Sequence, residues 1–341
     1  MKRLSMLLFI LAINTLLPRH ALSAGLCCQI SSGVQESFLG VASPEAGKFS
    51  LQTSYGFTMM DKLKEGSQEK SLQEVMDEKK YTTIPTEMAM SRYTLTAAFG
   101  LTPNFSAFVS MPYVRNTMEM VTVTDMGGLG VKVTGHETMT PVQGQGDVTL
   151  MGMYRIFNRR EGQSTDSVSL GLGVKTPTGS ATRKSASGNN IHAHMQPGTG
   201  SWDPIVSLLY TKGINPFLLQ ANATYQLSTR NQDGYDSGSS FMTDFSGKYT
   251  IAQPFNIVAG LTYFHLNQAS DRDGNYTNPT SLLDDTENTG GDSLWFSPGI
   301  QVLPIKNGSI DLKVQFPLWE HVNGVQLVSS YRILAGISYT F

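Results

Sequence analysis

The sequence predicts an all-β fold, an antiparallel, up-and-down transmembrane β-barrel of about twelve strands. Apolar and polar residues alternate with a period of two over most of the chain, which is typical of strands with one apolar face. Beyond the N-terminus, no apolar run reaches the roughly 18 residues that a membrane-spanning helix needs. Short connections between the strands alternate with long polar ones, as they do in outer-membrane barrels.

The N-terminal part of the chain is expected to lie outside the barrel. Residues 1–24 resemble a signal peptide, because two basic residues precede a short apolar stretch that ends in small residues. Residues 25–46 are expected to form an N-terminal periplasmic segment that could plug the barrel, and residues 47–341 form the barrel. The adjacent Cys27 and Cys28 are the only cysteines, so the sequence contains no disulfide framework.

The strands are predicted from the alternation itself. In residues 49–59, most odd positions are apolar or aromatic and the even positions are mainly small or polar. Segments of this kind run for about 9–13 residues, the length that a tilted strand needs to cross a bilayer. They begin near residues 47, 88, 105, 147, 167, 204, 217, 241, 255, 293, 309 and 330.

The connections between these segments have two lengths. The short ones are predicted at residues 101–104, 158–166, 212–216, 252–254 and 304–308. The long, polar ones are predicted at residues 60–87, 115–146, 176–203, 228–240, 267–292 and 320–329. Short periplasmic turns and long outer loops are typical of outer-membrane barrels, and an even strand number places both termini on the periplasmic side.

Closure of the barrel follows from the solvent. Hydrocarbon offers no hydrogen bonds, so the first strand has to pair with the last, which ends at Phe341. This ending resembles the terminal strand that the barrel-assembly machinery reads, so we expect that machinery to be a partner. The chain is therefore predicted to lie in outer-membrane lipid of a Gram-negative bacterium. Aromatic side chains are expected to face outward near strand ends at Phe49, Tyr113, Tyr154, Tyr249, Phe255 and Tyr339.

Several other classes of protein are disfavoured. The net charge is −2, so nothing indicates a nucleic-acid partner. Histidine occurs six times, and no Ser/His or Asp/His pair is predicted on neighbouring strand faces, so we do not expect an enzyme. A soluble β-sandwich would share the alternation, but it would not require a signal peptide or alternating loop lengths.

Charged residues on the strands are predicted to line the lumen, because a charge facing lipid costs about 2–4 kcal/mol at the midplane. One interpretation is a structural ion-pair network that braces the wall. The other is a selectivity lining with a mild preference for anions. The residues are Arg92, Asp147, Arg155, Lys175, Asp244, Lys248, Asp311, Lys313 and Arg332.

Two stretches in or beside the third long loop are further candidates. His192, His194 and Met195 offer ligands suited to copper or zinc, and methionines in residues 115–146 add to the supply. The alternative is an exposed loop in which these residues have no metal role. The second stretch is expected to fold inward and narrow the outer mouth above Lys175, although Trp202 would also suit an interfacial anchor. Its key residues are Gly198, Gly200, Trp202 and Asp203.

A set of short segments, in order along residues 47–341, resembles one known family. The segments are residues 101–105, 109–114, 144–148, 154–155, 173–179, 196–204, 294–299 and 322–326. They are similar to the outer-membrane transporter family named for the meta-pathway of phenol degradation. The resemblance implies a barrel that aids the uptake of hydrophobic or aromatic compounds.

The leading hypothesis from the sequence is an outer-membrane channel or transporter for a small solute, such as a hydrophobic or aromatic compound, without a required cofactor. One alternative is a metal-related barrel whose loop histidines and methionine bind copper or zinc. A second alternative is a closed structural or adhesive barrel.

Overall fold

The computed structural model describes residues 43–341, except residues 163, 186–187 and 189. The expected signal peptide, and the expected plug up to residue 42, lie outside the described residues. Where the description begins, the chain lies against the barrel wall: Ala46 forms a bridge with Gly100, and the Pro44 carbonyl accepts a hydrogen bond from Ser106. A Cβ atom at Gly100 would lie 2.1 Å from the Glu45 carbonyl oxygen, so this close approach requires glycine.

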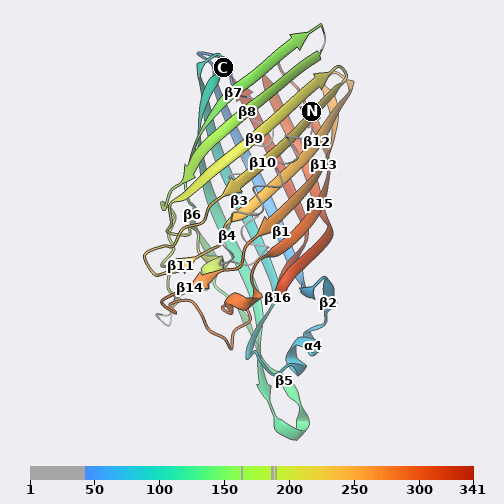
Figure 1. The fold of residues 1–341 in the computed structure, drawn as a ribbon. Helices are drawn as coiled ribbons and strands as arrows, with labels where there is room; N and C mark the ends of the chain where they lie inside the picture. The colour runs from blue at the N-terminus through green and yellow to red at the C-terminus, as the bar shows by residue number, and fades with distance from the viewer. Residues whose placement is uncertain (1–42, 163, 186–187, 189) are drawn as a thin grey trace, which may run out of the picture.

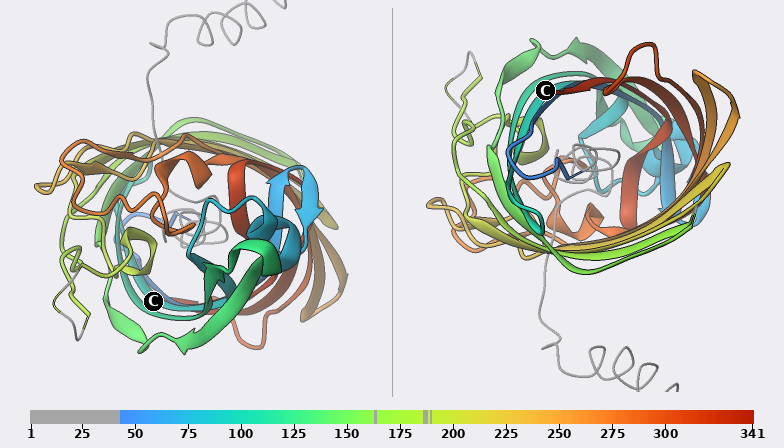
Figure 2. Two further views of the ribbon diagram at one scale, coloured as in Figure 1. Left: turned by 90° about the horizontal axis from the view of Figure 1, so that it is seen from below. Right: turned by 90° about the horizontal axis from the view of Figure 1, so that it is seen from above.

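Eleven strands pair in antiparallel order into one closed sheet (Figure 1). Each barrel strand pairs with the next along the chain, and β1 pairs with β16 to close the ring. Views along the axis show this ring, with segments of the long connections lying across it (Figure 2). The barrel strands are β1 (Phe49–Gly66), β3 (Thr83–Thr102), β4 (Phe105–Asp125), β7 (Thr149–Glu161), β8 (Ser164–Lys175), β9 (Asp203–Ile214), β10 (Phe217–Gln226), β12 (Ser240–Ala252), β13 (Phe255–Leu266), β15 (Gly291–Val302) and β16 (Gly308–Thr340).

Strand β16 crosses the wall twice. Its first limb pairs with β15 up to Val322, and its second limb pairs with β1 from Val322 onward. The hydroxyl oxygens of Ser309 and Ser338 lie 2.8 Å apart, so the two limbs lie side by side. The wall is therefore crossed twelve times, as the sequence predicts. The loop predicted at residues 320–329 is wrong, because these residues are strand up to and beyond a tight reversal at Gly324, whose φ is +55°.

The predicted faces of the strands are confirmed. Large apolar side chains such as Leu172 and Phe245 are exposed on the outer wall, whereas inward positions such as Thr96 and Asn222 are buried. All six aromatic residues that were expected to face outward are exposed. A closed barrel with such a wide apolar outer surface requires lipid around it.

The long connections lie at the opposite end of the barrel from the short turns, and β1, β3 and β4, like β16, continue into them (Figure 1). Residues 60–66, 83–87 and 115–125 were predicted as loop but belong to β1, β3 and β4. Their outward side chains, such as Lys62 and Glu119, are polar, so the pattern of an apolar outer face is lost there. Above the membrane the outer face meets water, and the apolar side chains point inward instead.

The connections at this end contain short elements of their own. In the described residues, no helix is long and apolar enough to span a bilayer. The elements are β2 (Gln68–Lys70), α4 (Leu72–Asp77), η1 (Gly127–Leu129), β5 (Val131–Thr138), β6 (Val142–Gln145), η2 (Ala193–Met195), β11 (Tyr235–Asp236), β14 (Ser270–Asp271) and η3 (Thr286–Asn288). Helix α4 begins with a capping box, in which the Ser71 and Glu74 side chains accept hydrogen bonds from each other's backbone amides.

The alternation of short turns and long loops predicts that the short-turn end is periplasmic. Single cysteines at Gln68 and Gln232, both exposed at the loop end, should react with a membrane-impermeant maleimide on intact cells. A cysteine at Lys306, in the last short turn, should react only after the outer membrane is permeabilised. Native cysteines are replaced by serine in all three proteins. The reverse labelling pattern would show that the barrel has the opposite orientation.

Candidate functional site: the lumen and its mouth

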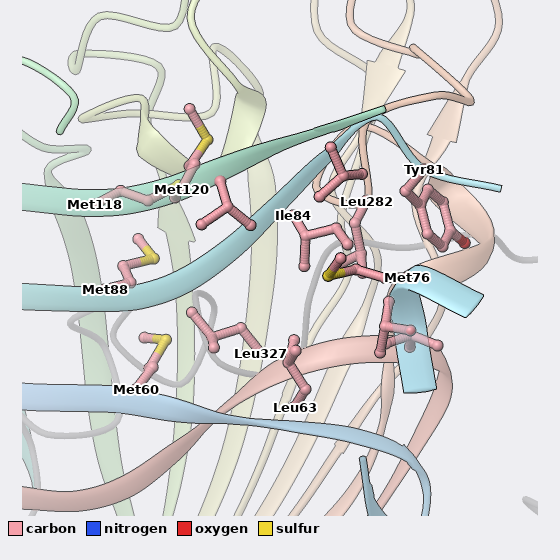
Figure 3. Close-up of a cluster of buried hydrophobic side chains, with 14 of the residues drawn as sticks. Met60, Leu63, Met76, Tyr81, Ile84, Met88, Met118, Met120, Leu282 and Leu327 are labelled. Atoms are coloured by element: carbon pink, nitrogen blue, oxygen red, sulfur yellow. The ribbon is translucent and has the colours of Figure 1, made fainter. Parts of the chain in front are cut away.

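The loop end of the barrel is filled by a cluster of buried apolar side chains, here named the mouth cluster (Figure 3). Seven of its eighteen buried residues are methionines, whose flexible side chains adapt to irregular spaces. The strand extensions supply their inward faces, and α4 and the loops cover them. The buried members are Met60, Leu63, Val75, Met76, Tyr81, Ile84, Met88, Met90, Met118, Met120, Val121, Val123, Val131, Val142, Met195, Leu282, Val325 and Leu327.

A first cavity, the upper cavity, adjoins the mouth cluster at Met90 and encloses about 100 Å³. Much of its wall is apolar, with prolines, alanines and two tyrosines from the loops. Three predicted lumen residues, Arg92, Asp147 and Lys175, also line this cavity.

A second cavity, the lower cavity, encloses about 220 Å³ and has a more polar wall. It is lined by four of the predicted lumen charges, Asp244, Lys248, Asp311 and Lys313. Lys248 donates a hydrogen bond to Gln301, whose amide nitrogen donates to Asp311 at 2.7 Å. The charges are therefore joined through polar side chains of the wall.

The remaining two predicted lumen residues have other surroundings. The Arg332 guanidinium lies 4.1 Å from the ring centroid of Trp295, and both side chains are buried. Trp295 also belongs to an apolar cluster with Met242 and Phe264. Arg155 instead donates a hydrogen bond to the carbonyl of Pro103 beside a short turn, and it lines neither cavity.

A buried ion-pair network fixes the loops to the wall. The Lys175 ammonium lies 2.5 Å from Asp203 and 3.6 Å from Asp147. Asp147 accepts hydrogen bonds from the backbone amides of Gly179 and Thr199, and Lys175 donates to the Thr199 hydroxyl. Both ends of this loop, at Gly179 and at Thr199, are thereby tied to the wall. For this part of the lumen, the geometry matches the interpretation of charges that brace the wall.

The stretch that was expected to narrow the mouth divides into two parts. Gly198 folds inward and lines the upper cavity, and a Cβ atom there would lie 2.5 Å from the Asp147 carboxylate. Gly200 has a φ of +73°, which favours glycine. Trp202, however, is 59% exposed and lies on the outer surface. The expectation that it constricts the mouth is wrong, because Trp202 directly precedes Asp203, which is inward-facing and fully buried.

The proposed metal ligands each have a different partner. The His192 Nδ1 atom lies 2.5 Å from the Asp284 carboxylate, and the His194 Nε2 atom lies 2.5 Å from the Leu283 carbonyl oxygen. Met195 is fully buried in the mouth cluster. Among the described residues, no group of three or more His, Cys, Asp or Glu side chains is placed to hold a metal ion. A copper or zinc site in this loop stays a prediction.

Sequence reasoning missed two features of the site. The loop methionines Met118 and Met120 were interpreted as possible metal ligands, but they face inward from β4 and pack in the mouth cluster. Asn116, on the same strand, lines the upper cavity. The signal was present, since Asn116, Met118 and Met120 follow the inward alternation of β4.

A closed antiparallel barrel with an apolar outer wall, and a lumen capped by its own loops, defines an outer-membrane β-barrel. A family model matches residues 81–327, and the chain belongs to this family, which is named for the MetA-pathway of phenol degradation. No curated protein matches the chain in sequence.

Solved structures of outer-membrane barrels are similar to the model. An outer-membrane channel from Pseudomonas putida F1 matches 88% of this chain and 97% of its own, with 13% identity and a TM-score of 0.57, which shows a shared fold. The monoaromatic hydrocarbon channel CymD matches 94% and 93%, with 11% identity and a TM-score of 0.40. The toluene transporter TbuX of Ralstonia pickettii matches 87% and 90%, with 10% identity and a TM-score of 0.38.

The buried network predicts a large effect of removing its cation. In Lys175→Met, two buried carboxylates lose their counterion, and we expect the free energy of unfolding to fall by about 3–5 kcal/mol. The matched control is Lys212→Met, which breaks a solvent-screened pair with Asp166 and should lower the free energy of unfolding far less. Urea unfolding in lipid vesicles measures both. Equal effects would show that Lys175 contributes no more than a surface charge.

Because the imidazole of His194 is buried, we predict that the packing of its loop against Leu283 depends on pH. Burial holds the pKa of His194 below its ordinary value of 6.5, although its hydrogen bond to Leu283 and the charge of Asp284 oppose this shift. The undocked loop therefore binds a proton more readily than the docked loop, and docking weakens as pH falls below 6.5. Amide hydrogen exchange of residues 193–196, corrected for intrinsic rates, should show less protection at pH 5.5 than at pH 7.5. In His194→Gln this pH effect should disappear, and unchanged protection in the native protein would contradict the argument.

Proposed function

We propose that the chain is an outer-membrane channel that admits small, largely apolar solutes. The mouth cluster is the observation that carries the proposal. An ion or sugar crossing it would lose hydration without gaining hydrogen bonds, whereas an apolar solute would exchange water for apolar contacts. Methionine side chains can also repack around solutes of different shapes.

The two cavities differ in polarity along the path that we assign to the solute. A solute that passes the mouth cluster enters the upper cavity beside Met90, where most of the wall is still apolar. The lower cavity is more polar and charged, so an apolar solute is held less well there. The weaker hold of the lower cavity eases release at the short-turn end, and the concentration gradient sets the direction of net movement. The family's name, which refers to the degradation of phenol, supports an aromatic cargo.

Blocking the upper cavity tests this function. Met90→Trp places a bulky ring in the upper cavity, so we expect the initial rate of labelled toluene uptake into expressing cells to fall roughly fivefold or more. The control is Leu129→Trp, because Leu129 is exposed at the tip of η1 and lies outside both cavities. Heat-modifiable migration on gels confirms that each barrel is folded. Uptake by the native chain no faster than in cells without it would refute a channel and favour a closed structural barrel.

A further inference from the structure

The upper cavity contains two buried hydrogen-bond acceptors that have no partner in the described part of the chain. They are the Asn116 Oδ1 atom and the His194 Nδ1 atom. Both residues line the cavity. Buried polar atoms nearly always have a partner, and leaving one without costs about 1–3 kcal/mol.

The orientation of the Asn116 amide is fixed by its other contact. Its Nδ2 atom donates a hydrogen bond to the Met195 carbonyl at 3.2 Å. A carbonyl can only accept, so turning the amide over would place two acceptors against each other. The Oδ1 atom of Asn116 therefore remains as an acceptor.

The same reasoning fixes the tautomer of His194. Its Nε2 atom lies 2.5 Å from the Leu283 carbonyl oxygen, so Nε2 carries the hydrogen. No acceptor in the described part of the chain lies within hydrogen-bond distance of Nδ1, so a second ring hydrogen would have no partner. The Nδ1 atom then presents a lone pair, which makes it an acceptor like Asn116 Oδ1. Asn116 and His194 are linked, because the Asn116 side chain is hydrogen-bonded to Met195, the residue that follows His194.

Two other polar groups around the cavity already have partners. The Tyr276 hydroxyl donates to the Ala181 carbonyl at 2.8 Å, and Lys175 is held by its ion pairs. The rest of the wall is largely apolar. A dry apolar cavity of about 150 Å³ binds benzene, so about 100 Å³ suits a molecule no larger than one ring. The apolar lining includes Met90, Pro112, Val114, Ala181, Ala193 and Pro197.

We propose that the upper cavity is a binding site for small neutral molecules that combine an apolar body with a hydrogen-bond donor, either a hydroxyl or an amine, which donates to Asn116 or to His194. This site rests on the proposed function, since it lies directly below the mouth cluster. A hydrocarbon or an ether of the same size fits the wall but leaves both acceptors unpaired. A carboxylate offers acceptors where donors are needed. The two residues thus select among the solutes that the mouth cluster admits.

Phenol and anisole test this selection, because they share the ring and the oxygen but anisole has no donor. Their affinities are measured by calorimetry on the full-length barrel in lipid nanodiscs, with empty nanodiscs subtracted. We expect the native barrel to bind phenol roughly five- to tenfold more tightly than anisole, the effect of one neutral hydrogen bond. Asn116→Leu, which keeps the volume and removes one of the two acceptors, should lower this ratio, mainly by weakening phenol binding.

A second variant and a control make the test independent of any one substitution. His194→Phe should lower the ratio in the same direction, and the double variant Asn116→Leu/His194→Phe should bring it to about one. Leu129→Ala is the control, because Leu129 lies outside the cavity and its loss should leave the ratio unchanged. Gel migration confirms that each barrel is folded. Equal affinities in the native barrel, or a full preference for phenol in Asn116→Leu/His194→Phe, would overturn the donor-selective site and indicate that water satisfies these acceptors. Toluene uptake that persists in that case would show that the channel function stands without it.

Discussion

The ladder between β1 and β16 is the constraint on which the rest of the barrel depends. In hydrocarbon, each unpaired backbone group costs several kcal/mol, so the first and last strands must pair over the whole membrane depth. The observed pairing runs from Ser50 with Thr340 to Gly66 with Val322. Because β1 has 18 residues and a tilted strand needs only about 9–11 to cross a bilayer, the ladder continues beyond the lipid. This excess length forms the wall of the mouth.

The extended strands keep one alternation, but their inward side chains change from polar to apolar along the strand. On β3, inward positions at membrane depth include Thr94 and Thr96, and further out they are Met88 and Met90. The lumen therefore becomes more apolar toward the loops, which is the opposite of an open aqueous pore. Water would enter such a mouth if it were uncovered, and α4 and the loop around Leu282 cover it. The closure of the ring by β1 and β16, the excess length of the strands and the packing of the loops thus form the covered mouth together.

Period-two alternation was sufficient to predict β10 at residues 217–226 and the inward position of Asp244, because one face there meets lipid. The alternation failed as a predictor where the outer face meets water. There the outward side chains, such as Lys62 and Glu119, are polar and the inward ones include methionines, so these strand residues were predicted as loop. It was also silent on the contacts of the site. The contacts of Asn116 with Met195 and of His194 with Leu283 join positions 79 and 89 residues apart. Each contact involves a loop residue whose position no periodicity describes.

Two kinds of contact hold the mouth closed, and they differ in what opening them would cost. Breaking the network of Lys175 with Asp147 and Asp203 would leave buried charges unpaired, at about 3–5 kcal/mol. Moving a methionine such as Met88 away from its preferred rotamer costs on the order of 1 kcal/mol and leaves no polar group exposed to the apolar interior. A solute therefore enters at lower cost between methionine side chains than by displacing the loop that Lys175 holds. The charges keep the upper cavity in shape while the methionines move, so that entry and selection depend on different residues.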